Sequence, residues 1–222
     1  MTKRVKRKIR VRNFLKFLCI LLIIFLIGYI LFTSKINNIV ITGNKYLTDD
    51  EVLETAGLKD YPSFFFTFDE EIKSKLKKNS FVKSVKISRS FFNNIHITIK
   101  EYEVVLKYNN EYYLENGIKV KDEDELRVPT LINEVPEKKL KDLCTSLSGV
   151  RSDILGKISE IEYTPNTYDD GRFLLYMNDS NSVYLTLTKF EKINYYDDVL
   201  AQLEGKKGFL YLDSGNHFKI ME

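Results

Sequence analysis

The stretch that decides the fold runs from Val85 to Ile99 and reads V-K-I-S-R-S-F-F-N-N-I-H-I-T-I. Apolar and polar residues alternate in both of its halves, which is the pattern of a strand with one buried and one solvated face. Between the halves, residues 91–94 (F-F-N-N) supply the turn. The stretch therefore predicts a β-hairpin that packs one face on a core.

Two short helices are expected before this hairpin. Thr48-Asp49-Asp50-Glu51 has the pattern of a capping box, in which the Thr hydroxyl and the Glu carboxylate each bind an exposed backbone N–H. The helix that it begins is expected to end at Gly57. Thr67-Phe68-Asp69-Glu70 repeats the pattern and predicts a second helix, on which Ile72 and Leu76 share one face.

A strand at Asn38–Thr42 completes the first folding unit. The order strand, helix, helix, strand, strand predicts a small α+β domain with both helices on one face of a three-stranded sheet. Phe64-Phe65-Phe66 and Phe68 lie between the two helices. We expect these rings to form a core plug that joins the helices, and a membrane-dipping or ligand-binding patch is the alternative.

After Glu103 the sequence changes to short strands separated by turn residues, among which Asn116-Gly117 is a strong tight-turn signal. The pattern favours a mainly antiparallel β domain with flanking helices. Its expected strands and extended pieces are Val104–Tyr108, Tyr112–Leu114, Ile118–Lys121, Val128–Ile132, Ile158–Tyr163, Arg172–Met177, Ser182–Thr186, Phe209–Leu212 and Phe218–Met221.

Two longer helices are expected in this second domain. Pro136 begins one of them, on which apolar residues recur at spacings of three and four. Those residues are Leu140, Leu143, Cys144 and Leu147. Thr188-Lys189-Phe190-Glu191 is a third capping-box pattern and predicts the other helix, which continues through Leu203.

An apolar run precedes both domains. No charged residue occurs from Phe17 to Phe32, and a helix from Asn13 to Thr33 would measure about 31 Å, enough to cross a hydrocarbon core of about 30 Å. The alternative is a cleaved signal peptide, whose apolar core is shorter and ends in a small-x-small cleavage site. Because Leu31–Lys35 has no such site, we expect an uncleaved anchor over residues 14–33.

The first sixteen residues hold eight cations and no acid, and without them the formal net charge of +3 becomes about −5. Such a tail can bind nucleic acid. Because a membrane segment follows it directly, we expect it to set topology instead, with the N-terminus cytoplasmic and the body outside. The topology-determining residues are Lys3, Arg4, Lys6, Arg7, Lys8, Arg10, Arg12 and Lys16.

Residues that could carry chemistry are scattered. His96 and His217 lack further ligands at metal-binding spacing, and Cys19 and Cys144 are expected neither to form a disulfide nor to act as nucleophiles. The acidic run at residues 121–125 lacks calcium-loop spacing, and the sequence has neither a G-x-S-x-G elbow nor a glycine-rich phosphate loop. We therefore expect no enzymatic activity, cofactor, metal, nucleic acid or small-molecule substrate.

Sheet edges are the remaining candidates for function. An edge strand presents unpaired N–H and C=O groups to which an incoming strand can bind. The last predicted strand, at Phe218–Met221, is the natural candidate for such an edge. The alternative is that this segment is frayed or paired within the chain.

Several segments, taken in order, resemble the FtsQ/DivIB family of bacterial cell-division proteins. Ser80 and Phe92 stand where the family usually has proline, Asn94 where it has threonine, and Tyr102 where it has arginine. The matching segments are Ile39–Asn44, Thr48–Val52, Asn79–Val85, Phe91–Ile97, Val128–Leu131 and Lys207–Gly215.

The resemblance implies a cytoplasmic tail at residues 1–13, a transmembrane helix at 14–33, a POTRA domain at 34–103 and a β domain at 104–222. It also implies a non-enzymatic scaffold at the division septum that binds and stabilises a complex of DivIC/FtsB-like and FtsL-like proteins and helps regulate septal peptidoglycan synthesis. The alternative is a membrane-anchored POTRA chaperone or receptor in protein export. Carried across by position, the expected interface residues are Leu212, Asp213, Ser214, Gly215, Phe218 and Ile220.

Overall fold

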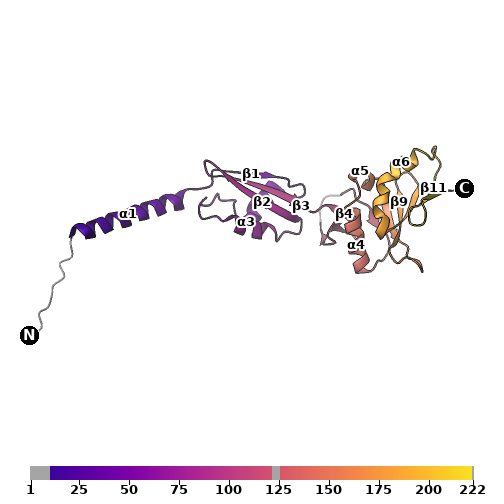
Figure 1. Ribbon diagram of the computed structural model, residues 1–222, viewed down its shortest axis with the longest axis horizontal. Helices are drawn as coiled ribbons and strands as arrows, with labels where there is room; N and C mark the ends of the chain where they lie inside the picture. The colour runs from indigo at the N-terminus through magenta and orange to yellow at the C-terminus, as the bar shows by residue number, and fades with distance from the viewer. Residues whose placement is uncertain (1–10, 122–125, 222) are drawn as a thin grey trace, which may run out of the picture. The chain divides into compact units, whose positions relative to one another are not determined.

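The structure is a computed structural model that describes residues 11–121 and 126–221 of the 222-residue chain. Its contacts divide the chain into two compact units, and the boundary along the sequence lies between Glu101 and Tyr102 (Figure 1). The fold is α+β, as the sequence predicts.

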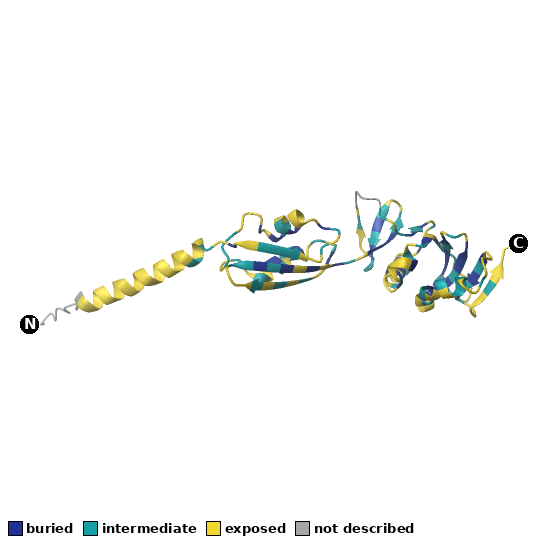
Figure 2. Ribbon diagram, turned by 90° about the horizontal axis from the view of Figure 1, so that it is seen from above, coloured by how far each residue is buried: buried dark blue, intermediate teal, exposed yellow. Residues whose placement is uncertain are grey.

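Helix α1 spans Val11–Thr33. From Arg12 to Thr33 it has a mean hydropathy of 2.8 and is long and apolar enough to cross a membrane. Its side chains are exposed along its length (Figure 2), including almost every large apolar one. A lipid bilayer stabilises such a helix. Its backbone N–H and C=O groups bond to one another within the helix, and its apolar side chains contact the lipid chains.

The first unit beyond α1 holds a three-stranded sheet and two helices. Strand β3 lies between the other two, parallel to β1 and antiparallel to β2. The predicted order of elements is confirmed. The elements are β1 (Asn38–Thr42), α2 (Asp49–Ala56), α3 (Asp69–Leu76), β2 (Val82–Ser90) and β3 (Asn94–Glu101).

The alternation in β3 determines where this unit has its core. Ile95, Ile97 and Ile99 are buried, and they belong to one apolar cluster with residues of both helices, such as Val52 of α2 and Ile72 of α3. Both helices therefore cover the same face of the sheet, because successive side chains of a strand point to opposite faces.

The first capping box forms as predicted. Glu51 N donates to Thr48 Oγ1 at 3.3 Å, Thr48 N donates to Glu51 Oε2 at 2.8 Å, and α2 ends at Gly57 in the left-handed conformation. The second box is wrong: the N-cap of α3 is Phe68, and no side chain caps the helix. Thr67 precedes the N-cap, and its hydroxyl donates instead to Ser63 O at 2.7 Å.

The prediction that the four phenylalanines between the helices form a core plug is wrong for three of them. Phe65, Phe66 and Phe68 are exposed, and Phe64 alone of the four rings is half-buried, beneath the Arg89 guanidinium at 4.7 Å from its ring centroid. The buried space between the helices is taken by smaller aliphatic side chains from α2, α3 and β3. The phenylalanine run is thus left in the loop that joins the helices.

A buried carboxylate fastens the loop after β1 to the end of β3. The side chain of Glu101 accepts hydrogen bonds from the backbone N–H groups of Lys45, Tyr46 and Leu47, at 2.8, 2.7 and 3.2 Å. Gly43, at φ +83°, begins this loop, and a Cβ there would lie 2.2 Å from Ile99 O. The loop is therefore held by the Glu101 carboxylate, and its first position requires glycine.

The second unit is built on a sheet of nine strands in the order β12-β11-β10-β9-β8-β7-β4-β5-β6 within the described residues. Its strands are β4 (Val104–Tyr108), β5 (Glu111–Leu114), β6 (Lys119–Val120), β7 (Thr130–Leu131), β8 (Ile158–Tyr163), β9 (Arg172–Met177), β10 (Ser182–Thr186), β11 (Gly208–Tyr211) and β12 (His217–Ile220). Its helices are α4 (Glu137–Leu147), α5 (Ser152–Leu155), η1 (Leu187–Tyr195) and α6 (Tyr196–Leu200).

Most pairs of neighbouring strands in this sheet are antiparallel, as predicted, but β4–β7, β7–β8 and β10–β11 are parallel. A parallel pair needs a long crossover. Helices α4 and α5 lie in the crossover from β7 to β8, and η1 and α6 lie in the one from β10 to β11. The helices of this domain are thus its crossover connections.

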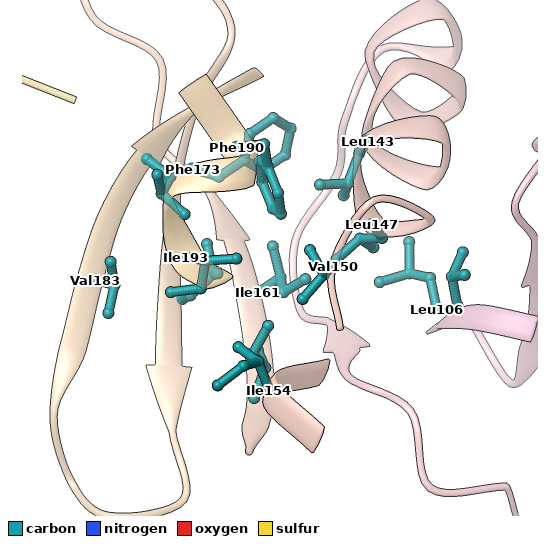
Figure 3. Close-up of a cluster of buried hydrophobic side chains, with 14 of the residues drawn as sticks. Leu106, Leu143, Leu147, Val150, Ile154, Ile161, Phe173, Val183, Phe190 and Ile193 are labelled. Atoms are coloured by element: carbon teal, nitrogen blue, oxygen red, sulfur yellow. The ribbon is translucent and has the colours of Figure 1, made fainter. Parts of the chain in front are cut away.

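These helices supply eight of the 22 buried residues in the core of the second unit. Figure 3 shows Leu143 and Leu147 of α4, and Phe190 and Ile193 of η1, gathered with strand residues such as Phe173. Cys144 is fully buried beside them, and burial raises the pKa of its thiol to about 12, so it stays a neutral apolar group.

The third predicted capping box is wrong too. The helix is a 3₁₀ helix at η1, its N-cap Thr186 makes no side-chain cap, and Lys189 has non-helical φ and ψ. Phe190, Ile193 and Tyr196 are spaced by three and are all buried. A helix with three residues per turn aligns Phe190 and Ile193 on one face, and Tyr196 begins the α-helix that follows.

Candidate partner-binding edge

Strand β12 is an edge of the large sheet, and in the described part of the chain β11 is its one neighbour. The register pairs Phe209 with Lys219 and Tyr211 with His217, and Met221 N donates to Lys207 O at 2.9 Å. In an antiparallel pair, bonded and non-bonded positions alternate. The N–H and C=O groups of Phe218 and Ile220 therefore point to the open side of the sheet.

Close backbone contact holds this short strand in place. A Cβ on Gly208 would lie 2.0 Å from Lys219 O, so only glycine lets β11 and β12 approach this closely. Gly208 N also donates to the buried side chain of Asn181 at 3.0 Å. The His217 ring also stacks on the Tyr211 ring of the neighbouring strand, with centroids 4.6 Å apart. The edge is therefore presented by a fixed strand.

An ion pair fixes the corner where β11 turns toward β12. Arg172 Nε lies 2.7 Å from Asp213 Oδ2, and both side chains are largely buried. Burial raises the pKa of Asp213, but the hydrogen bonds from Arg172 and Ser214 outweigh it and hold the pKa below its usual value. The Arg172 guanidinium also stacks on Tyr184 at 3.8 Å, and Tyr184 O accepts from Leu212 N at 2.9 Å.

An apolar groove lies beside the edge strand. It has a volume of about 480 Å³ and runs between β11–β12 and the helical segment η1–α6. Its apolar wall comes mainly from Tyr195, Val199, Leu203, Leu210, Leu212 and Phe218. Exposed bonding groups and an apolar receptor are therefore adjacent, which is the arrangement that strand addition uses.

The six predicted interface residues fall into three groups. Phe218 and Ile220 lie on β12, and Ser214 and Gly215 lie in the exposed turn before it. Leu212 is buried, and Asp213 is held by Arg172, so both shape the corner. Sequence reasoning missed the helical wall. The spacing of Tyr195, Val199 and Leu203 on one helical face was its signal, but a core-facing stripe gives the same signal.

The other residues singled out for chemistry lie apart. His96 Nε2 is 3.2 Å from Ser90 Oγ, and both cysteines are free. In the described residues no group of three or more His, Cys, Asp or Glu side chains is arranged to hold a metal.

Two groups of predicted residues fall partly or wholly outside the described ranges. Of the eight topology-determining cations, Arg12 and Lys16 lie on α1. The acidic residues 122–125, and the remaining cations, lie outside the described residues. These cations are Lys3, Arg4, Lys6, Arg7, Lys8 and Arg10.

Comparisons with known proteins agree with this architecture. Residues 34–102 match the POTRA domain, FtsQ-type. The chain is 35% identical to the cell division protein DivIB of Bacillus cytotoxicus, over 91% of this chain and 83% of that one. It is 31% identical to DivIB of Bacillus subtilis, over 91% of this chain and 80% of that one.

A solved structure of the major extracytoplasmic domain of DivIB from Geobacillus stearothermophilus aligns with 47% of this chain and 96% of that one, at 24% identity and a TM-score of 0.40. The relatives named above are cell division proteins, which are not a known enzyme family. With its apolar α1, the protein is a single-pass membrane protein. It belongs to the DivIB family of cell division proteins.

Proposed function

We propose that the protein is a non-enzymatic scaffold of the division machinery, concentrated at the septum. It binds and stabilises membrane-anchored proteins of the DivIC/FtsB and FtsL types and so helps regulate septal peptidoglycan synthesis. The observation that carries this proposal is the open edge of β12 beside an apolar groove. The protein acts by accepting a strand from its partner.

The edge and the groove contribute different parts of the binding energy. Phe218 and Ile220 each present one N–H and one C=O, and a typical hydrogen bond adds a net of about 0.5–1.5 kcal/mol. A Leu- or Phe-sized partner side chain buried in the groove adds about 1.5–3 kcal/mol. Neither contribution is sufficient alone, so the partner needs a strand whose alternate residues on one face are apolar.

The anchor raises the effective concentration of this edge for partners in the same membrane. Lys16 and Arg12 belong to the basic N-terminal segment, which favours the cytoplasmic side by the positive-inside rule. The topology is then single-pass with the N-terminus inside. Both units, with the POTRA domain at residues 34–103 and the β domain at 104–222, lie outside.

Ile220→Pro tests the edge. Proline removes one outward N–H and places its ring on the open side, while the bonds to β11, made at residues 219 and 221, stay intact. With the full chain in nanodiscs and the external domains of DivIC-like and FtsL-like partners, we expect affinity to fall about tenfold or more, a loss of about 1.4 kcal/mol.

Ile220→Ala is the matched control, since it keeps the N–H and trims only a half-exposed side chain. We expect it to lose much less affinity than the proline variant. Equal binding by Ile220→Pro and the wild type, or no binding by the wild type at micromolar concentrations, would contradict the proposal.

A further inference from the structure

Five exposed phenylalanines gather on the first unit, from two loops far apart in the sequence. Phe65, Phe66 and Phe68 come from the loop between α2 and α3 and are 48–61% exposed. Phe91 and Phe92 form the tip of the β2–β3 turn and are 89% and 85% exposed. Water is an unfavourable environment for so much aromatic surface in one place, and a patch of this kind marks an interaction site.

Both loops are bonded to the four residues that follow the membrane helix. Ile36 N donates to Pro62 O at 3.0 Å, and Phe64 N donates to Ser34 O at 2.8 Å. From the other loop, Asn93 Nδ2 donates to Ser34 Oγ at 2.7 Å, and Asn93 O accepts from Asn37 N at 3.0 Å. The phenylalanines are thus fastened to the point where the chain leaves the anchor.

Two contacts reach the last turn of α1 itself. Ser63 Oγ donates to Leu31 O at 3.0 Å, and the rings of Phe66 and Phe32 meet edge to face with centroids 5.9 Å apart. Residues 14–33 span about 30 Å of helix, which matches the thickness of the hydrocarbon core, so Thr33 lies at its outer boundary. The two loops that carry the five rings are therefore bonded to the chain at the level of the outer headgroups.

The backbone of the β2–β3 turn points the same way. Phe92 has φ +64°, a left-handed conformation that costs energy for a bulky residue and that glycine or asparagine would adopt more easily. Asn93 follows at φ +58°, so Phe92 is one of two successive left-handed residues at which the chain reverses direction at the tip of the turn. Strain of this kind is concentrated at functional sites.

We propose that Phe65, Phe66, Phe68, Phe91 and Phe92 form a juxtamembrane aromatic surface that inserts into the outer leaflet of the bilayer. This surface gives the first unit a second contact with the membrane besides α1. The contact is apolar, because the Arg89 guanidinium beneath these loops is neutralised by Asp69 and donates to Phe64 O and Thr67 O. It therefore persists in neutral lipid.

Tryptophan fluorescence tests this directly, since the chain contains no tryptophan. Phe91→Trp places a single indole at the most exposed ring of the surface, in the full chain reconstituted into phosphatidylcholine nanodiscs. Lys100→Trp is the matched control: it is exposed at the other end of β3, about 20 Å along the strand. Lipids brominated near the glycerol end of the acyl chain serve as quencher.

We expect the brominated lipid to quench about half or more of the Phe91→Trp emission and to leave Lys100→Trp unchanged, as an indole at the interface requires. Replacing phosphatidylcholine with phosphatidylglycerol should change neither result. Equal quenching of the two variants overturns the proposal. So does an indole that stays water-exposed in lipid alone and becomes shielded only when a partner protein is added, which would make the surface a protein-docking site.

Discussion

The two sheets of the molecule end in edge strands of opposite character. Strand β2 is the longer, with nine residues, but its exposed positions are polar or charged, as at Ser84, Lys86 and Ser88. Strand β12 has four residues, and an apolar groove lies between the β11–β12 pair and the helical segment η1–α6. Charged side chains on an edge discourage the addition of another strand. The two edges therefore differ in their surroundings, since an apolar groove adjoins the shorter strand and polar side chains cover the longer one.

The largest effect on partner affinity is expected when β12 is displaced from the sheet. Gly208→Val places a branched side chain where even a Cβ would meet Lys219 O at 2.0 Å. We expect partner affinity to fall about a hundredfold, or about 2.7 kcal/mol, and the free energy of unfolding to fall by about 2 kcal/mol. Calorimetric titration and denaturant unfolding measure the two effects.

Gly149→Ala serves as the control for this variant, because its Cβ would meet Ser146 O at an ordinary 3.5 Å. It should change neither quantity appreciably. Retained affinity in Gly208→Val would show that the partner does not need β12 in its place.

The second test asks whether destabilising the first unit leaves partner binding by the second unit unchanged. Glu101→Ala removes the acceptor for three backbone N–H groups and should destabilise the first unit by about 3 kcal/mol. Glu101→Gln keeps one oxygen and should lose about half as much. Hydrogen exchange should then rise in residues 38–101, while partner binding at β12 stays unchanged. A loss of affinity in Glu101→Ala would assign part of the interface to the first unit.

The third test concerns the corner before β12. Asp213→Asn removes the charge that faces Arg172 and should destabilise the second unit by about 2 kcal/mol at pH 7. The pKa of Asp213 is lower in the folded state than in the unfolded chain. The stabilisation is therefore present above the ordinary value of about 3.9 and is lost as the pH falls through the folded pKa.

Unfolding curves between pH 2 and pH 7 measure this dependence. The wild type should lose more stability on acidification than Asp213→Asn, since the variant lacks the group that takes up the proton. Parallel stability curves for the two proteins would show that the pair adds nothing to folding.

The smallest effect is expected at the other edge. Lys86→Ile removes a charge from the exposed side of β2 and should change partner affinity by less than about twofold. The substitution makes β2 more apolar but gives it no groove, so it separates the effect of an apolar edge from that of an apolar groove. A clear gain or loss of affinity would show that β2 takes part in binding after all.

Sequence patterns predicted most of the elements, and they failed where similar local patterns meet different surroundings. Three segments are expected to begin helices with a capping box, but of these only the one with Thr48 and Glu51 forms it. The hydroxyl of Thr67 bonds to the preceding loop, and the segment from Thr188 gives way to a 3₁₀ helix that buries Phe190 and Ile193. A capping-box pattern supplies side chains that can bond to the backbone of the first turn, but the surrounding structure decides whether these hydrogen bonds form.

The phenylalanine run shows the same limit at the level of function. Its composition fits a core plug and a membrane-facing patch equally well, because both need apolar rings. What separates them is the bonding of the loop to Ser34, some thirty residues earlier in the chain, and of Asn93 to the same serine. Neither contact leaves a local signal in the sequence.

Hydropathy and periodicity were enough to predict the membrane helix, the order of the POTRA elements and the alternating strands, because both patterns involve only neighbouring residues. The tertiary structure alone decided that β12 is an open edge, that Gly208 and Asn181 hold it, and that Arg172 fixes its corner through Asp213. Those pairs are 27 and 41 residues apart. Their meeting depends on which strands become neighbours, and this is set by the packing of the whole core.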